Sequence, residues 1–154
     1  MIQEDIMYLA RDEDVLFDFN YRYKIKAPTF SQQMKKGKPI TIFENIDEFS
    51  EKLICNKEIL IKLISTCLSC QNGVIKENNS IFFKGHYEDE VINEIICNFI
   101  KKYMLCEECD KPEIKLISNR GITYICDACG NEGSIEYDQK IYDFVEKKIK
   151  QKAS

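Results

Sequence analysis

Four cysteines in two Cys-x-x-Cys pairs are the residues best suited to do chemistry in this sequence. Cys106 and Cys109 form the first pair, and Cys126 and Cys129 form the second after sixteen intervening residues. Two such pairs at this separation are typical of a four-thiolate zinc site, because each tight turn lets two sulfurs converge on one ion. Four protein ligands leave no open position on the metal. We therefore expect one structural Zn²⁺ rather than a catalytic one.

Three other interpretations of the four cysteines stay open at this point. An iron-binding rubredoxin-like site has the same ligands, a redox dithiol needs only one pair, and unligated cysteines could meet this spacing by chance. Zinc is favoured because a ribbon of about 30 residues buries too little apolar surface to fold alone, whereas a structural zinc supplies about 10–16 kcal/mol.

The other reactive side chains predict no second site. Cys67 and Cys70 repeat the spacing, but Cys67 falls on the apolar stripe of a helix. We interpret this pair, together with Cys55 and Cys97, as free thiols. His86 is the only histidine, and we expect it to cap a helix or lie at the surface. Without a Ser-His or Cys-His pair, ordinary acid–base catalysis is not expected, so the chain is not predicted to be an enzyme.

Length, composition and charge bound the class of protein. The chain has 154 residues, 44% of them apolar, which suits one medium domain or two small ones. It has no run of eighteen apolar residues and an acidic N-terminus, which predicts a soluble, cytoplasmic protein whose eight cysteines stay reduced. Residues 1–20 are acidic, whereas residues 21–40 carry six bases and no acid. This basic stretch is either a phosphate-binding surface or a solvated charged loop.

Hydrophobic periodicity predicts the elements that must position the cysteines. Residues 39–43 alternate as a strand, and Asn45 is placed to cap a helix over 46–54. Apolar stripes predict helices over 57–68 and 87–104, the second of which runs almost directly into the first cysteine pair. Between these helices, Asn78-Asn79 separates two short strands of a predicted β-hairpin.

The predicted fold class is α+β, with helices packed on a β-hairpin or sheet to form a small α-β module. A four-cysteine zinc ribbon follows, whose hairpin uses residues 114–118 and 122–126, and a C-terminal helix ends the chain. The predicted domains are an N-terminal arm at 1–37, the module at 38–104, the ribbon at 105–137, and the C-terminal helix and tail at 138–154. Residues 12–36 show no strong hydrophobic periodicity. This part of the arm is therefore either an ordered arm or a segment that is disordered in the free protein.

Several motifs together resemble a known family. F-I-K-K-Y-M-L-C-E-E-C-D-K-P-E, followed by Y-I-C-D-A-C-G, resembles the domain shared by translation initiation factor 5 and the beta subunit of translation initiation factor 2. K-P-I-T-I-F-E-N-I-D-E-F and N-N-S-I-F-F-K-G-H-Y resemble the start and the hairpin of that family's α-β module. The resemblance covers residues 38–135.

Shorter motifs favour one branch or the other. Y-R-Y-K at 21–24 resembles the segment of factor 5 in which an arginine assists GTP hydrolysis by the gamma subunit of factor 2, and the matching position is Arg22. D-Q-K-I-Y-D-F-V-E-K is also similar to factor 5, whereas K-G-H-Y favours the beta subunit. Factor 5 is the better match. Arg22 is therefore the arginine-finger candidate, although it could instead contact ribosomal RNA or pack its stem between Tyr21 and Tyr23.

The resemblance implies a translation initiation factor. We expect it to act with the GTP-bound ternary complex of factor 2 on the small ribosomal subunit in start-codon selection, at most as a GTPase activator. The implied partners are the gamma subunit or the ternary complex, the small subunit with its rRNA, and initiator tRNA. No membrane contact is expected, and the free protein is expected to be monomeric. The alternatives are a non-catalytic, beta-like subunit that binds the gamma subunit and a zinc-ribbon RNA-binding or transcription module.

Two departures from the family pattern complete this interpretation. The sequence shows neither the helical-repeat domain of factor 5 nor the lysine blocks of the beta subunit. A minimal member of the family is therefore expected.

Overall fold

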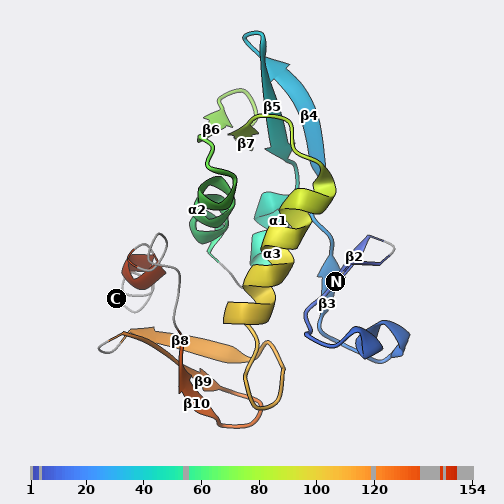
Figure 1. The fold of residues 1–154 in the computed structure, drawn as a ribbon, viewed down its shortest axis with the longest axis vertical. Coiled ribbons are helices and arrows are strands. Elements are labelled where there is room, and N and C mark those ends of the chain that lie inside the picture. The colour runs from blue at the N-terminus through green and yellow to red at the C-terminus, as the bar shows by residue number, and fades with distance from the viewer. Residues whose placement is uncertain are drawn as a thin grey trace. The chain divides into compact units, whose positions relative to one another are not determined.

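The chain has a mixed α+β fold, as predicted (Figure 1). The computed structural model describes residues 2–3, 5–53, 56–118, 121–135, 143 and 145–148. It divides into two compact units. We call Lys26–Ile96 the sheet unit, and Met1–Ile25 with Cys97–Ser154 the ribbon unit. The domain limits given above stay a prediction.

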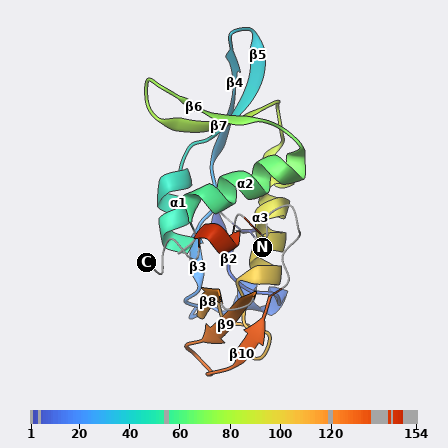
Figure 2. The ribbon, with the colours of Figure 1, turned by 90° about the vertical axis from the view of Figure 1, so that its left-hand side faces the viewer.

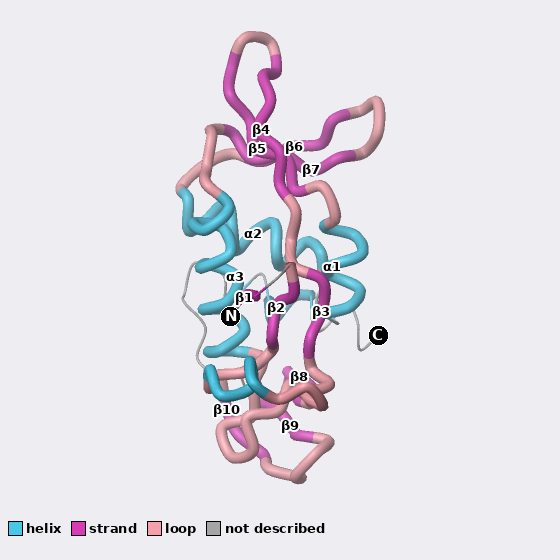
Figure 3. Tube along the Cα trace, turned by 90° about the vertical axis from the view of Figure 1, so that its right-hand side faces the viewer, coloured by secondary structure: helices cyan, strands magenta, loops and turns pink. Residues whose placement is uncertain are grey.

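The sheet unit is built on one antiparallel sheet of four strands in the order β4-β5-β7-β6. Its strands are β4 (Phe30–Lys35), β5 (Lys38–Phe43), β6 (Asn72–Ile75) and β7 (Ser80–Lys84). Its helices are α1 (Ile46–Leu53), α2 (Lys57–Leu68) and the first half of α3 (Asp89–Tyr103). The two hairpin loops extend away from α1 and α2 (Figure 3).

Alternation along β5 gives the sheet two apolar faces. Phe43 is buried on one face and contacts Phe49 of α1, with ring centroids 5.8 Å apart. Ile40 and Ile42 lie on the other face, where they pack with Phe82. Because the central strands are buried on both sides, β5 and β7 read as nearly continuous apolar runs. The predicted helices, the strand at 39–43 and the hairpin through Asn78-Asn79 are confirmed.

Two features of the sheet unit differ from the sequence-based expectations. Strand β4 lies in the stretch for which no strong period was found. Asn45 directly precedes α1 as predicted, and its carbonyl accepts the Phe49 N–H (2.8 Å), but its side chain does not cap the helix. That side chain accepts a hydrogen bond from the Thr29 N–H (2.8 Å) and donates one to the Ala27 carbonyl (3.1 Å). Asn45 therefore joins β5 to the chain entering β4, because an asparagine side chain can satisfy both backbone groups of a neighbouring segment.

The ribbon unit contains a second antiparallel sheet of three strands in the order β10-β9-β8 (Figure 2). The predicted hairpin forms β8 (Ile114–Ser118) and β9 (Ile122–Cys126), and β10 (Glu132–Ser134) was not predicted. The arm contributes β1 (Ile2–Gln3), β2 (Ile6–Tyr8), a 3₁₀ helix (Glu13–Phe17) and β3 (Lys24–Lys26). The predicted C-terminal helix is helical at 143 and 145–148, and the rest of 138–154 lies outside the described residues.

Within the described part of the chain, no helix combines the length and the apolar character needed to cross a membrane.

Candidate metal centre

The structure brings the four predicted ligand cysteines together in the ribbon unit. Their Sγ atoms all lie within 4.8 Å of one another. The Sγ atoms of Cys106 and Cys129 are 3.6 Å apart, as are those of Cys109 and Cys126. Metal–sulfur bonds of about 2.3 Å in a tetrahedron separate the sulfurs by about 3.8 Å, so these thiols fit a tetrahedral ion. The cluster could therefore hold a metal ion.

Each cysteine pair sits in a turn with the same backbone hydrogen bonds. We call residues 106–111 the first knuckle and residues 126–131 the second knuckle. In the first, the Cys106 N–H donates to the Lys111 carbonyl (3.1 Å) and the Asp110 N–H donates to the Cys106 carbonyl (2.9 Å). In the second, the N–H groups of residues 126 and 130 make the corresponding bonds to the carbonyls of residues 131 and 126, at 2.9 and 2.8 Å. The repeated turn explains why both pairs present their sulfurs to one point.

The same turn requires a left-handed backbone at its fifth residue. Asp110 has a φ of 59° and Gly130 has a φ of 78°. Glycine adopts this conformation freely, and aspartate is among the few other residues that tolerate it. This explains why a glycine directly follows the second cysteine pair and an aspartate the first.

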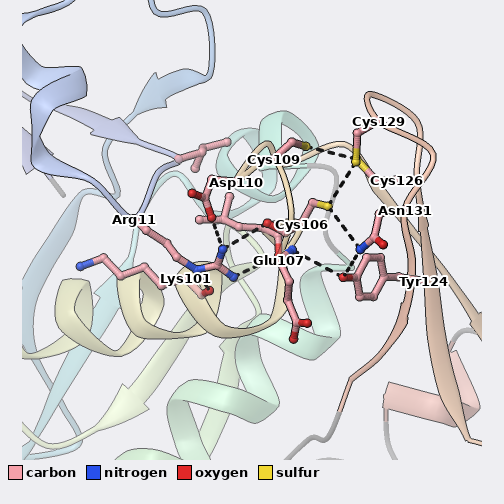
Figure 4. Close-up of polar contacts among 12 residues, drawn as sticks. Arg11, Lys101, Cys106, Glu107, Cys109, Asp110, Tyr124, Cys126, Cys129 and Asn131 are labelled. Carbon is pink, nitrogen blue, oxygen red and sulfur yellow. Dashed lines mark hydrogen bonds and ion pairs between the residues drawn. The ribbon is translucent and has the colours of Figure 1, made fainter.

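Tyr124 forms the apolar support between the knuckles. Its side chain is buried and packs in a cluster with Cys106 and Cys126. Its hydroxyl accepts a hydrogen bond from Asn131 Nδ2 (3.1 Å), and the same Nδ2 lies 3.9 Å from the Sγ of Cys106 (Figure 4). The ring covers Gly133, its partner in β10, where an added Cβ would lie 2.6 Å from a ring carbon.

The thiols of the two knuckles have different proton affinities. Burial raises the pKa of Cys106, but N–H groups of Cys109 and Glu108 and the neighbouring thiols outweigh it and lower this pKa to about 7. The Asn131 N–H lowers the pKa of Cys129, but desolvation and the other three thiols outweigh that and raise it to about 12. Desolvation also raises the pKa of Cys109. Close thiols cannot all ionise together, so a cation is the partner that this cluster needs to become fully anionic.

The remaining candidate residues lie outside this cluster. Cys67 is exposed, Cys70 and Cys97 are half-buried, and Cys55 lies outside the described residues. His86 is exposed, and its Nε2 lies 3.1 Å from the Gln33 carbonyl oxygen. Among the described residues, the four ribbon cysteines are the metal-ligand cluster found.

Arg22 lies on the arm, within the ribbon unit. Its side chain is 73% exposed, and its guanidinium lies 4.8 Å from the ring centroid of Tyr23. The Nη2 atom is 2.6 Å from the Tyr23 hydroxyl and 3.4 Å from Oε1 of Glu113. The residue is thus stacked on one neighbouring tyrosine and open to solvent.

Sequence reasoning missed Arg11, which contacts the first knuckle (Figure 4). Its guanidinium binds the Cys106 carbonyl and the carboxylate of Asp110. One feature of the sequence could have pointed to Arg11: it is the one basic residue within the acidic residues 1–20.

Comparisons with known proteins relate both units to translation. A family model that describes a domain found in initiation factors 2B and 5 matches residues 12–132. Eukaryotic translation initiation factor 5 of Dictyostelium discoideum is 27% identical over 128 residues, which are 82% of this chain and 32% of that protein. Translation initiation factor 2 subunit beta of Methanopyrus kandleri is 29% identical over 129 residues, which are 83% of this chain and 88% of that protein. The chain thus spans about a third of the length of the factor 5 relative.

Proposed function

The chain belongs to the family defined by this domain of initiation factors 2B and 5, and on that premise we propose that it acts in translation initiation as a protein of the factor 5 type. In this role it binds the GTP-bound ternary complex of factor 2 on the small ribosomal subunit, in the cytoplasm, and takes part in start-codon selection. Through Arg22 it promotes GTP hydrolysis by the gamma subunit. The observation that carries this proposal is that the family model spans the arm, the module and the ribbon together.

The proposed metal is one structural Zn²⁺ held by Cys106, Cys109, Cys126 and Cys129. Four convergent sulfurs suit zinc, which needs no redox chemistry to stabilise a fold. When bound, the ion would offset two of the four thiolate charges and would fix the two knuckles relative to each other. Elemental analysis of protein prepared without added metal tests this assignment, with one zinc per chain expected. A stoichiometric content of iron would overturn it.

The surroundings of Arg22 support its proposed role as an arginine that reaches the GTP bound to the gamma subunit. The tyrosines on either side are fastened within the ribbon unit: the Tyr21 hydroxyl donates to the Leu9 carbonyl (2.7 Å), and the Tyr23 hydroxyl donates to Glu113 (2.6 Å). Arg22 itself is mostly exposed and only weakly paired with Glu113. An anchored backbone with a mostly exposed guanidinium suits the stabilisation of charge on a transferring phosphoryl group, once the guanidinium leaves Tyr23 and Glu113.

The hairpin of β4 and β5 supports contact with ribosomal RNA or initiator tRNA. Its tip carries Lys35, Lys36 and Lys38 with no acidic residue between them. Lys36 and Gly37 both have positive φ, which is typical of the tight two-residue hairpin turn. A rigid finger with a basic tip suits phosphate contacts that position a protein on folded RNA.

The experiment that tests the activator role times phosphate release from purified ternary complex on small ribosomal subunits. We expect wild-type protein to accelerate the release and Arg22→Ala to lose about 10³–10⁵-fold of that acceleration. Lys24→Ala is the matched control, because Lys24 is an exposed base two residues away. No acceleration by wild type, or equal acceleration by Arg22→Ala, would remove the activator role.

A second function is favoured by one comparison. The match to the factor 2 beta subunit of Methanopyrus kandleri covers most of that protein, which suits a non-catalytic subunit bound stably to the gamma subunit. Co-purification with the gamma subunit in stoichiometric amount, through gel filtration, would favour this role over the factor 5 type. A general zinc-ribbon RNA-binding or transcription module is not favoured, since the family match extends well beyond the ribbon.

A further inference from the structure

Arg11 of the arm makes a set of polar contacts directly beside the metal centre. Its Nε donates to the Lys101 carbonyl (3.2 Å), its Nη2 to the Leu105 carbonyl (3.2 Å) and its Nη1 to the Cys106 carbonyl (3.1 Å). Nη1 also pairs with the carboxylate of Asp110. One side chain from the arm thus binds four groups that lie 90 to 99 residues away in the sequence.

These contacts satisfy carbonyls at a helix end. Lys101 lies in the last turn of α3, which ends at Tyr103, and Leu105 and Cys106 come shortly after that end. Carbonyls at the end of a helix have no partner within the helix, and a cation there is favourable because of the helix dipole. Arg11 therefore joins the end of α3 to the start of the first knuckle.

The fourth contact holds the one residue of the first knuckle that has an unfavourable backbone. Asp110 has a positive φ, and its carboxylate is held by Arg11. The N–H of Asp110 donates to the same Cys106 carbonyl that Arg11 binds. The guanidinium thus binds the carbonyl that accepts this turn-closing hydrogen bond and the side chain of the residue that donates it.

The arm carrying Arg11 is itself packed within the ribbon unit. Met7, Leu9 and Ala10 are buried, and the Leu9 N–H donates to the Tyr23 carbonyl (2.9 Å). Arg11 is therefore presented by an ordered backbone, and its side chain is only 33% exposed. Releasing the arm would remove the guanidinium from the first knuckle.

We infer that Arg11 is a positioning residue of the metal centre, which holds the first knuckle ready for its ion and links metal retention to docking of the arm. The inference rests on the proposed four-cysteine metal site. Because the linkage is thermodynamic, arm docking and metal binding favour each other by the same factor. Outer contacts that orient metal ligands typically contribute 10- to 100-fold in affinity.

The test uses the full chain and measures affinity for Co²⁺ from its thiolate charge-transfer absorption, and for Zn²⁺ by competition with a chromophoric chelator. We expect Arg11→Ala to lower both affinities about 10- to 100-fold. Arg11→Lys keeps the positive charge but loses the planar guanidinium that binds several acceptors at once. Its metal affinity should therefore lie between those of wild type and Arg11→Ala. Lys115→Ala is the matched control, because it removes the exposed Lys115–Asp127 ion pair at the second knuckle. Its metal affinities should stay within about twofold of those of wild type.

Two further measurements separate positioning from general destabilisation. A double-mutant cycle of Arg11→Ala with Asp110→Asn should show metal affinities that are not additive, because both variants remove the same contact. Hydrogen exchange of the Leu9 amide should accelerate on metal removal by about the factor by which Arg11→Ala lowers metal affinity. If Arg11→Ala does not fold, the metal affinities of Arg11→Lys and Asp110→Asn are compared with that of wild type instead.

Arg11→Ala affinities within twofold of wild type, or additive effects in the cycle, would overturn the role of Arg11. Wild-type protein that takes up no Co²⁺ would overturn the metal site itself, independently of Arg11.

Discussion

The two knuckles share a backbone turn but are supported in different ways. Both close with the same pair of hydrogen bonds, and both have a positive φ at the fifth residue. At that position the first knuckle has Asp110, held by Arg11 of the arm, whereas the second has Gly130, around which an added Cβ would contact nothing. The turn alone brings the two sulfurs of each knuckle together, whereas the contacts around it decide how firmly each cysteine pair is held.

Accessibility separates the two cysteines within each knuckle. Cys106 and Cys126 are both buried, whereas Cys109 is half-buried and Cys129 is exposed. Arg11 contacts the first knuckle, and the second knuckle lies between β9 and β10 of the ribbon sheet, whereas Tyr124 packs against cysteines of both knuckles. We therefore expect the second knuckle to open more readily than the first when the centre is disturbed.

Metal removal should have the largest effect and should reveal this order. A structural zinc contributes about 10–16 kcal/mol, so chelation should strongly reduce the protection of the β8 and β9 amides from hydrogen exchange. At limiting chelator, the N–H groups of Cys126 and Gly130 should lose protection before those of Cys106 and Asp110. Exchange measured by NMR gives the order, and returning one equivalent of Zn²⁺ should restore protection. Simultaneous loss in both knuckles would contradict the proposed difference in support.

Much of the metal centre could be predicted from sequence because its chemistry lies in side-chain identity. The spacing of Cys106, Cys109, Cys126 and Cys129 was enough to predict which sulfurs converge. Arg11 could not be found in this way, since three of its partners are backbone carbonyls, which every residue has. Only the fold shows which carbonyls near the end of α3 lie within reach of Arg11.

Two strands that the sequence did not predict, β4 and β10, lie at sheet edges. β4 reads F-S-Q-Q-M-K, with three consecutive exposed residues, because it has one strand neighbour and so little of it is buried. β10 is Glu-Gly-Ser and shows no alternation at all. Both form because a neighbouring central strand supplies hydrogen bonds and apolar cover. By contrast, the central strands β5 and β9 and the amphipathic helices carry their own periodic signal.

Gly133→Ala should have the next largest effect and should act on the second knuckle through Tyr124. The new Cβ would lie 2.6 Å from the Tyr124 ring, so either the ring or β10 must move. Overpacking of this kind costs about 1–3 kcal/mol, which should appear as a lower midpoint for chelator-induced unfolding. Gly130→Ala is the matched control, because it adds the same methyl group in open space and strains only the backbone, by about 1–2 kcal/mol.

The two glycine variants should also differ in kind. Gly133→Ala should change the tyrosine region of the near-ultraviolet circular dichroism, to which the buried Tyr124 contributes, whereas Gly130→Ala should leave this region unchanged while weakening metal binding. An unchanged tyrosine signal in Gly133→Ala would show that Tyr124 does not support the second knuckle as described.

The smallest predicted effect concerns protons and separates Cys106 from Cys129. At pH 8 the Cys106 thiol of metal-free protein, with a pKa of about 7, is mostly ionised, whereas Cys129, with a pKa of about 12, keeps its proton. Metal binding requires thiolates. It must therefore displace the Cys129 proton at both pH 8 and pH 6, but the Cys106 proton only at pH 6. The number of protons released per ion should therefore rise by about one between pH 8 and pH 6. Metal affinity should fall as the pH falls, and more steeply below pH 7.

Isothermal titration of Zn²⁺ in two buffers with different protonation enthalpies counts these protons directly. Cys67→Ser is the matched control, since Cys67 lies outside the cluster and its loss should leave the count unchanged. A count that stays constant from pH 6 to pH 8 would mean that the N–H groups of the first knuckle do not stabilise a thiolate at Cys106 in solution. In that case the two knuckles would differ in their contacts to the arm and to β10, but not in the chemistry of their sulfurs.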